Sequence, residues 1–135
     1  MANVYHLADD QFWYNIERDH HYNGGVYKLF CMYGVEKKPI NRLLGTDDNG
    51  ILYIGQTQCF LNRVIDLKTS ISREYENQNH DAGNRYNANS KIAEMFPYDE
   101  LYVELFVNND PVTLERKEIN EYINKFGELP PLNRQ

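Results

Sequence analysis

The stretch GVYKLFCM at residues 25–32 decides the fold of this chain, together with ILYIG at residues 51–55. Both stretches are rich in β-branched and aromatic residues, and each has a glycine at one end, so we expect two strands. The polar connection between them, residues 33–50, ends in the sequence DNG, which is a strong turn signal. These features predict a hairpin with an enlarged loop.

Helical signals lie on both sides of this hairpin. We expect four helices: one within the N-terminal extension at residues 1–23, and others at about residues 58–75, 90–96 and 111–126. An aspartate at residues 9–10 can cap the first helix, and Thr57 can cap the second. The last helix has the clearest boundaries, because an Asp-Pro pair at residues 110–111 precedes it and Gly127 follows it.

A third strand is expected at residues 101–107, where LYVELFV puts its leucines and valines on one face. Residues 76–89, rich in Asn and Gly, are expected to form a loop. The predicted order is β-β-α-α-β-α. We therefore expect an α+β fold in a single domain over residues 1–135, with a small three-stranded antiparallel sheet flanked by helices.

The charge of the chain limits how it can bind nucleic acid. The net charge is −6, and residues 94–135 carry 4 basic and 9 acidic side chains, compared with 10 basic and 11 acidic ones in residues 1–93. This balance argues against a protein that holds nucleic acid by bulk electrostatics alone. It does not exclude an enzyme that has a basic surface in its first part.

The composition also indicates where the chain resides. No apolar run approaches the roughly 20 residues that span a bilayer, and the N-terminus lacks the basic and apolar regions of a signal peptide. Cys31 and Cys59 stand far apart and are expected to be reduced thiols. We therefore expect a cytoplasmic protein, in a bacterial or phage-like setting, that does not bind a membrane.

An acidic side chain interrupts the apolar stripe of the last predicted helix. The stripe is about 100° wide and consists of Val112, Ile119, Tyr122, Ile123 and Phe126. Glu115 falls inside this stripe and Glu118 lies at its edge. A carboxylate in an apolar face is costly unless it is paired or bound to a metal. A salt bridge to a lysine or arginine, or a stripe that ends before Glu115, would also explain the pattern.

Three further residues stand out, although each has an ordinary explanation. Tyr27 and Tyr53 each lie in a predicted strand close to a glycine, where tyrosines most often serve packing. Arg63 lies at the flank of the apolar side of the second predicted helix, and alone it would be a solvated surface arginine. The functional interpretation depends on their occurring together.

Together, these residues resemble the signature of the GIY-YIG nuclease family. GVY at residues 25–27 and YIG at residues 53–55 look like its two tripeptides, and Thr57 and Arg63 follow the second glycine at the family's spacing. Two downstream segments are also similar to the family, LE at residues 114–115 and PPLN at residues 130–133. The resemblance covers about residues 24–133 and implies a metal-dependent endonuclease that hydrolyses phosphodiester bonds.

The resemblance implies a role for each matching residue. Glu115 would hold one Mg²⁺ or Mn²⁺, a hard cation that prefers oxygen ligands and keeps several waters. Arg63 would bind the phosphate with its planar fork. Tyr27, assisted by Tyr53, would activate or position the attacking water, and Asn133 would form hydrogen bonds around the site where nucleic acid binds.

The sequence departs from the family pattern in several places. The family usually joins its tripeptides by a short turn, whereas here 25 residues separate the two tyrosines, which makes residues 33–50 an enlarged insertion. Leu67 stands where the family often has His or Tyr, so the usual proton-transfer partner is missing. His80 or Lys28 could substitute for it. Glu118 remains a lesser candidate for the metal ligand.

The expected substrate is DNA, with RNA not excluded. Lys37, Lys38 and Arg42 are expected to flank the cleft and contact phosphates, with the negative excess of residues 94–135 turned away. Sequence preference would come from the insertion, from Asn side chains of residues 76–89 unless these form a solvated loop, or from a homodimer or partner protein. The alternative function is a catalytically inactive GIY-YIG-like binding or inhibitor module.

Overall fold

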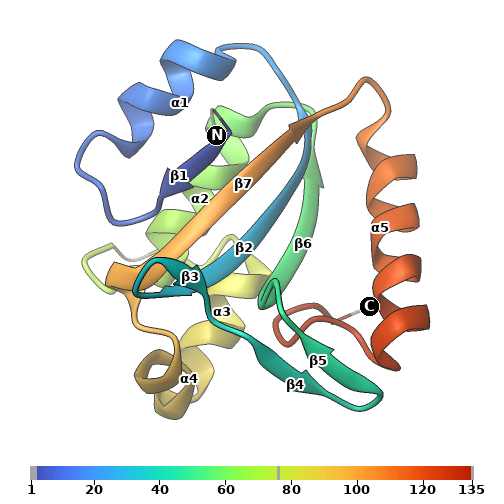
Figure 1. The fold of residues 1–135 in the computed structure, drawn as a ribbon. Coiled ribbons are helices and arrows are strands. Elements are labelled where there is room, and N and C mark those ends of the chain that lie inside the picture. Colours follow the sequence, from blue (N-terminus) through green and yellow to red (C-terminus); the bar gives the residue numbers. More distant parts are fainter. Residues whose placement is uncertain (1–2, 76, 135) are drawn as a thin grey trace.

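An antiparallel sheet lies at the centre of the fold (Figure 1). The structure is a computed structural model and describes residues 3–75 and 77–134. The described residues form a five-stranded sheet of β1 (Val4–His6), β7 (Leu101–Val107), β2 (Gly25–Tyr33), β3 (Glu36–Lys37) and β6 (Ile51–Thr57). Strand β2 is central and pairs with β7 on one side and with β6 and β3 on the other.

The sheet formed by the described residues has five strands, more than the three expected from the sequence. Strands β2, β6 and β7 lie where the sequence predicts them, but β1 from the N-terminal extension pairs with β7, as in Tyr5 with Val103. The insertion adds β3 and a separate two-stranded sheet of β4 (Ile40–Arg42) and β5 (Gly45–Asp47). These short strands were missed because their pairing partners, and not their own sequence patterns, hold them extended.

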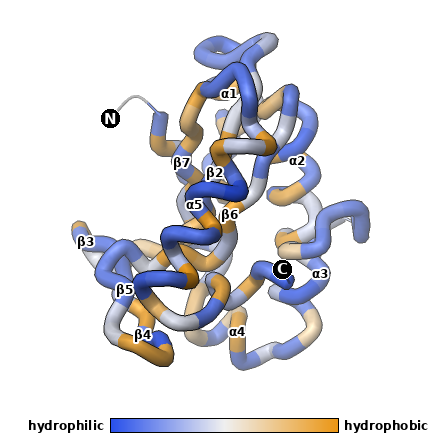
Figure 2. The backbone as a smooth tube through the Cα atoms, turned by 90° about the vertical axis from the view of Figure 1, so that its right-hand side faces the viewer, coloured by the Kyte–Doolittle hydropathy of each residue, from blue (hydrophilic) through white to orange (hydrophobic). Residues whose placement is uncertain are grey.

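Helices cover both faces of the sheet (Figure 1). The described helices are α1 (Phe12–His20), α2 (Phe60–Ile71), α3 (Asp81–Ala88), α4 (Ser90–Met95) and α5 (Pro111–Phe126), with a short 3-10 turn at Tyr98–Glu100. One face carries α1, α2 and α3, and the other carries α5. Figure 2 shows α5 in front of β2 and β6, mostly hydrophilic with a few hydrophobic residues. None of these helices is long and apolar enough to cross a membrane.

The sheet separates two apolar clusters. The larger one joins Tyr27 and Leu29 of β2 to Phe60 and Leu67 of α2 and to Tyr86 of α3. The smaller one consists of Val26, Ile54, Tyr122 and Phe126, which pack between the sheet and α5. Because side chains alternate along a strand, Tyr27 faces α2 and α3, whereas its neighbours Val26 and Lys28 face α5.

The strongest helix boundaries are confirmed. The Asp110 side chain accepts a hydrogen bond from the Thr113 N–H, and Gly127 ends α5 with a left-handed φ of 81°. The Asn-rich residues 76–89 were wrongly expected to be a loop, because α3 occupies 81–88. Helix α3 begins after His80, whose ring accepts the Ala82 N–H, and histidine is not among the usual capping residues.

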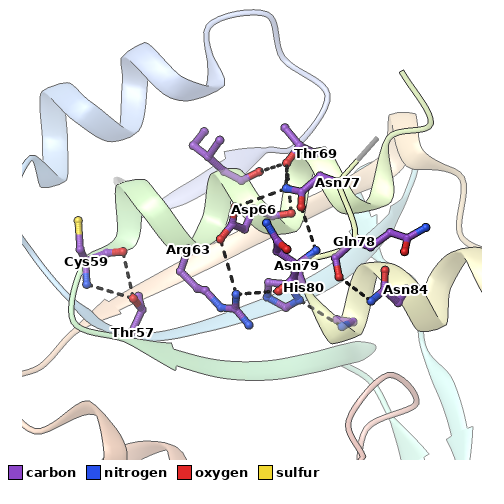
Figure 3. Close-up of polar contacts among 12 residues, drawn as sticks. Thr57, Cys59, Arg63, Asp66, Thr69, Asn77, Gln78, Asn79, His80 and Asn84 are labelled. Atoms are coloured by element: carbon purple, nitrogen blue, oxygen red, sulfur yellow. Dashed lines mark hydrogen bonds and ion pairs between the residues drawn. The ribbon is translucent and has the colours of Figure 1, made fainter. Parts of the chain in front are cut away.

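The starts of the first two helices also differ from expectation. Helix α2 begins after Cys59, and Thr57 instead accepts the Cys59 N–H in the turn that precedes the helix (Figure 3). Helix α1 begins after Gln11, whose N–H is accepted by the side chain of Asp9. The predicted capping residues therefore lie in the correct turns but one or two residues too early.

Candidate functional site

Two tyrosines and a histidine from three elements meet on the face of the sheet that carries α2 and α3. The ring centroids of Tyr27 and Tyr53 are 5.9 Å apart, and that of His80 lies 5.3 Å from Tyr53 and 6.1 Å from Tyr27. The Tyr27 hydroxyl and His80 Nε2 are hydrogen-bonded at 2.8 Å. The hairpin of β2 and β6 thus sets the tyrosines side by side, and the start of α3 adds the histidine.

Gly55 makes room for the two phenol rings. It lies opposite Tyr27 in the β2–β6 register. A Cβ atom there would come within 2.6 Å of Tyr27 Cζ and of Tyr53 Cε2, closer than nonbonded carbon atoms approach. The glycine of the second tripeptide is therefore required by the packing of the rings above it.

Arg63 reaches this group from α2. Its Nη1 donates a hydrogen bond to the Asn79 carbonyl at 3.2 Å and lies 3.6 Å from the Asp66 carboxylate. Figure 3 shows the arginine extending from α2 towards the segment 77–80. Asn77 fixes that segment to α2 by donating a hydrogen bond to Thr69 at 2.6 Å. The Arg63 side chain keeps 34% of its surface exposed, so a ligand can reach it.

The charge of Arg63 acts on the neighbouring rings. Burial raises the pKa of Tyr27 well above its usual value, Tyr53 raises it further, and Arg63 opposes this rise. Burial also raises the pKa of Tyr53, and Arg63 again opposes it. Burial, assisted by Arg63, lowers the pKa of His80 to about 3, so this imidazole is neutral at neutral pH. The site therefore contains two phenols and a neutral imidazole beside a fixed positive charge.

Arg85 belongs to the same site, whereas the sequence indicated only that it lies in the segment 76–89 that could contact bases. Its positive charge lowers the pKa of both Tyr53 and His80. Its Nε donates a hydrogen bond to the Leu132 carbonyl at 2.6 Å, which joins α3 to the C-terminal segment. No local pattern could reveal this residue, because its role depends on where α3 packs.

Glu115 lies on α5, which packs on the opposite face of the sheet. Its negative charge raises the pKa of Tyr53. Burial raises the pKa of Glu115 itself, against the lowering effect of Arg116. Within residues 3–75 and 77–134, the carboxylate forms no ion pair. The salt bridge considered as an explanation for this residue is therefore not seen among the described side chains.

The donor set at Glu115 fits a weakly held hard cation and not an all-protein metal cage. The described residues contain no group of three or more His, Cys, Asp or Glu side chains that could hold a metal. Mg²⁺ is often held by one or two carboxylates plus substrate phosphates, and it keeps several waters. A partly buried carboxylate without an ion-pair partner suits that role, and a nearby cation would favour its charged form.

Lys28 and Glu118 form an ion pair on the face of the sheet that carries α5. The Lys28 ammonium donates to the Glu118 carboxylate, and the ammonium also lies 5.0 Å from the Phe106 ring centroid. Both residues are on the side of the sheet away from the Tyr27 ring. Lys28 is therefore not placed to exchange a proton with Tyr27, and Glu118 has a cationic partner that Glu115 lacks.

The three basic residues expected to flank the cleft have other neighbours. Arg42 donates to the Leu129 carbonyl at 2.7 Å and pairs with Glu128 at 3.4 Å, with 13% of its side chain exposed. Lys37 lies 3.9 Å from Glu104, which belongs to the α5 face. Lys38 donates to the Met95 carbonyl at the end of α4. These residues tie the insertion to the rest of the fold, and they do not converge on the tyrosines.

Asn133 binds the backbone of the strand that carries Tyr53. Its Oδ1 accepts the Ile54 N–H and its Nδ2 donates to the Ile54 carbonyl, both at 2.9 Å. The Leu132 N–H also donates to the Leu52 carbonyl at 2.8 Å. Both ends of the amide are thus used inside the protein, so Asn133 anchors the site and is not free to contact nucleic acid.

No protein-family model, curated protein or solved structure matches this chain. The resemblance to the GIY-YIG family therefore rests on the matching residues of the sequence alone.

A cavity beside the segment 77–80 lacks the chemistry of the site. Its volume is about 720 Å³, and its lining includes Ser70, Arg73, Tyr75, Asn77 and Asn84. This lining offers amides, hydroxyls and one guanidinium, but no carboxylate or imidazole. The group around Tyr27 combines proton-transfer groups, positive charge and a carboxylate near Tyr53. Those are the components that hydrolysis of a phosphodiester requires.

Proposed function

We propose that this chain is a metal-dependent endonuclease of the GIY-YIG type, which hydrolyses phosphodiester bonds in DNA or RNA. The observation that carries the proposal is the contact of Tyr27 with His80 and Tyr53 beneath the Arg63 guanidinium, with the charge of Glu115 acting on Tyr53. These five residues lie far apart in the sequence, and together they supply the hydroxyl, imidazole, guanidinium and carboxylate groups of such a site.

Arg63 and Arg85 would bind and orient the scissile phosphate. A guanidinium presents a planar set of N–H donors that matches two phosphate oxygens at once. Hydrolysis adds negative charge to those oxygens in the transition state, and fixed positive charge lowers its energy. Arg63 is the stronger candidate for direct contact because of its exposed surface, whereas Arg85 is held against the C-terminal segment.

Tyr27 would position the attacking water through its hydroxyl oxygen. A phenol with a raised pKa is a poor base at neutral pH, so it acts best as a hydrogen-bonding group or as a phenolate stabilised by nearby positive charge. Tyr53 interacts with both Tyr27 and Glu115, because its ring lies next to the Tyr27 ring and the charge of Glu115 raises its pKa. It would link the water-positioning group to the carboxylate.

Glu115 would hold one Mg²⁺ or Mn²⁺ at the edge of β6. The cation, when bound, supplies charge neutralisation at the phosphate and the leaving oxygen. A single site of this kind cuts one strand, so cleavage of a duplex would need a homodimer or two successive nicks. A partner protein could supply sequence preference.

The test compares two glutamates of the same helix. Plasmid nicking is measured with and without Mg²⁺ for the wild type, Glu115→Gln and Glu118→Gln. We expect Glu115→Gln to abolish Mg²⁺-dependent nicking and to fold normally, because the amide keeps the shape but loses the charge. Glu118→Gln should nick at the wild-type rate, because its carboxylate serves Lys28.

Two outcomes would contradict the proposal. Wild-type protein that binds DNA or another protein without nicking any tested nucleic acid would favour the inactive binding module. Equal loss of nicking in both glutamine variants would show that the effect is structural, and circular dichroism of each variant checks for that.

A further inference from the structure

His80 makes two hydrogen bonds, one through each ring nitrogen. Nδ1 lies 3.1 Å from the backbone nitrogen of Ala82, in the first turn of α3. Nε2 lies 2.8 Å from the Tyr27 hydroxyl oxygen. The ring is fully buried, so water cannot substitute for either partner.

The first of these bonds fixes the position of the proton on the ring. A backbone N–H can only donate, so Nδ1 must accept and cannot carry a hydrogen. A neutral imidazole has one N–H, which must then be on Nε2. Nε2–H therefore donates to the Tyr27 oxygen, and the lone pair needed to take a proton from Tyr27 is not available.

The surroundings keep the ring neutral. Arg63 of α2 and Arg85 of α3 oppose a positive charge on it, whereas Asp81 of α3 favours one, and burial outweighs Asp81. The two remaining titratable neighbours, Tyr27 of β2 and Tyr53 of β6, are phenols with raised pKa values and are uncharged at neutral pH. The start of α3 also carries the positive end of the helix dipole, which disfavours an imidazolium there.

We propose that His80 is a fixed, neutral hydrogen-bond donor to Tyr27 and not the base that removes its proton. The Tyr27 oxygen then accepts from His80, which leaves its own hydrogen for another acceptor such as the neighbouring Tyr53. A donor at this oxygen stabilises the phenolate form more than the phenol. His80 is thus a positioning residue that acts through Tyr27, and its catalytic meaning rests on the proposed nuclease function.

The tautomer can be observed without any assay of cleavage. Long-range nitrogen–proton NMR correlations on protein with ¹⁵N-labelled histidine distinguish the two neutral tautomers and the imidazolium, and the His80→Gln variant assigns the signal. We expect the proton on Nε2, with no titration from about pH 8 to about pH 5, whereas a free histidine titrates near 6.5. A proton on Nδ1, or an imidazolium at pH 6, would overturn the proposal.

Two variants separate donation from proton removal. His80→Gln keeps an N–H donor long enough to reach Tyr27, whereas His80→Asn keeps a good cap for α3 but is too short. We expect His80→Asn to reduce cleavage by about 10- to 100-fold, the range for losing one hydrogen bond to a charged group, and to shift the rise of the pH–rate profile to higher pH. His80→Gln should retain most of the activity and the wild-type profile.

The outcomes keep this inference apart from the proposed function. Equal losses of about 100-fold or more in both folded variants are expected for a general base and would overturn the donor role. If His80→Gln fails to fold, His80→Asn assigns the histidine signal instead, and the NMR result on the wild type decides. If the wild type cleaves nothing, the nuclease proposal fails, and the NMR measurement still tests the tautomer.

Discussion

The guanidinium of Arg63 is held by protein on one side. Among the described residues, its hydrogen bond and its ion pair both use Nη1, which contacts Asn79 and Asp66. A side-chain hydrogen bond from Arg63 also lowers the pKa of Tyr27, and 34% of the arginine side chain is exposed to a ligand. The charge of Arg63 lowers the pKa of Tyr27, Tyr53 and His80. A phosphate bound to this guanidinium would therefore lie next to their rings.

Replacing this arginine by lysine keeps the charge and removes the fork. We expect Arg63→Lys to reduce cleavage by about 100-fold or more, the scale for losing one preorganised donor at the reacting group, while DNA affinity changes little. Single-turnover cleavage and binding titrations measure the two effects separately. Arg18→Lys on α1 is the control, since Arg18 pairs with the adjacent Asp19 away from the site. Wild-type rates in Arg63→Lys would show that Arg63 is a surface residue.

Sequence spacing identified Tyr27, Tyr53, Arg63 and Glu115 as candidates, but it could not supply their partners. The Tyr27–His80 hydrogen bond joins residues 53 positions apart, and the role of Arg85 depends on the docking of α3. Spacing within one helix or hairpin is local information. Which residues meet across elements depends on the packing of the whole core.

The same distinction explains which elements could be predicted. Strand β7 and helix α5 carry their own signals, an alternating apolar pattern and a capped start with a glycine stop. Strand β1 has three residues and is held by β7, about 100 positions away in sequence. Helix α3 contains two Asn and one Gly among eight residues and is capped by a histidine, so local propensity argues against it.

The C-terminal segment 130–134 acts as an extra partner for the free edge of β6. Leu132 and Asn133 together bind the backbone of Leu52 and Ile54, on either side of Tyr53. The asparagine side chain takes the place of a neighbouring strand by meeting both the N–H and the carbonyl of Ile54. This element therefore fixes the strand that presents Tyr53 to the site.

Removing that side chain should loosen the strand locally. We expect Asn133→Ala to cost about 1–3 kcal/mol of unfolding free energy, because two backbone groups lose their partner, and to speed hydrogen exchange at the Ile54 amide. Cleavage should fall as Tyr53 loses its fixed position. Asn41→Ala is the control, since the Asn41 side chain accepts a hydrogen bond from exposed Thr46 in the small β4–β5 sheet. Unchanged exchange at Ile54 would show that the anchor is not needed.

At the scale of the whole molecule, the proposed function requires a chain with a net charge of −6 to bind nucleic acid, which is a polyanion. The basic residues of the insertion are not placed to bind it at the site. Arg42 pairs with Glu128 and donates to the Leu129 carbonyl, and Lys37 lies on the α5 face. Two exposed arginines are better placed. Arg116 is close enough to Glu115 to lower its pKa, and Arg134 directly follows the Asn133 anchor. Basic residues next to the site can thus act locally within an acidic chain.

The salt dependence of DNA binding tests this distribution. Each phosphate contact contributes about 0.9 to the slope of the logarithm of affinity against the logarithm of salt concentration. In the Glu115→Gln background, which leaves the DNA uncut, replacing Arg116 and Arg134 by glutamine should lower that slope by about 2. The matched control, Lys37→Gln with Lys38→Gln, removes the same charge from the insertion and should leave the slope unchanged. The reverse result would show that nucleic acid lies along the insertion and would contradict the placement of the substrate over the edge of β6.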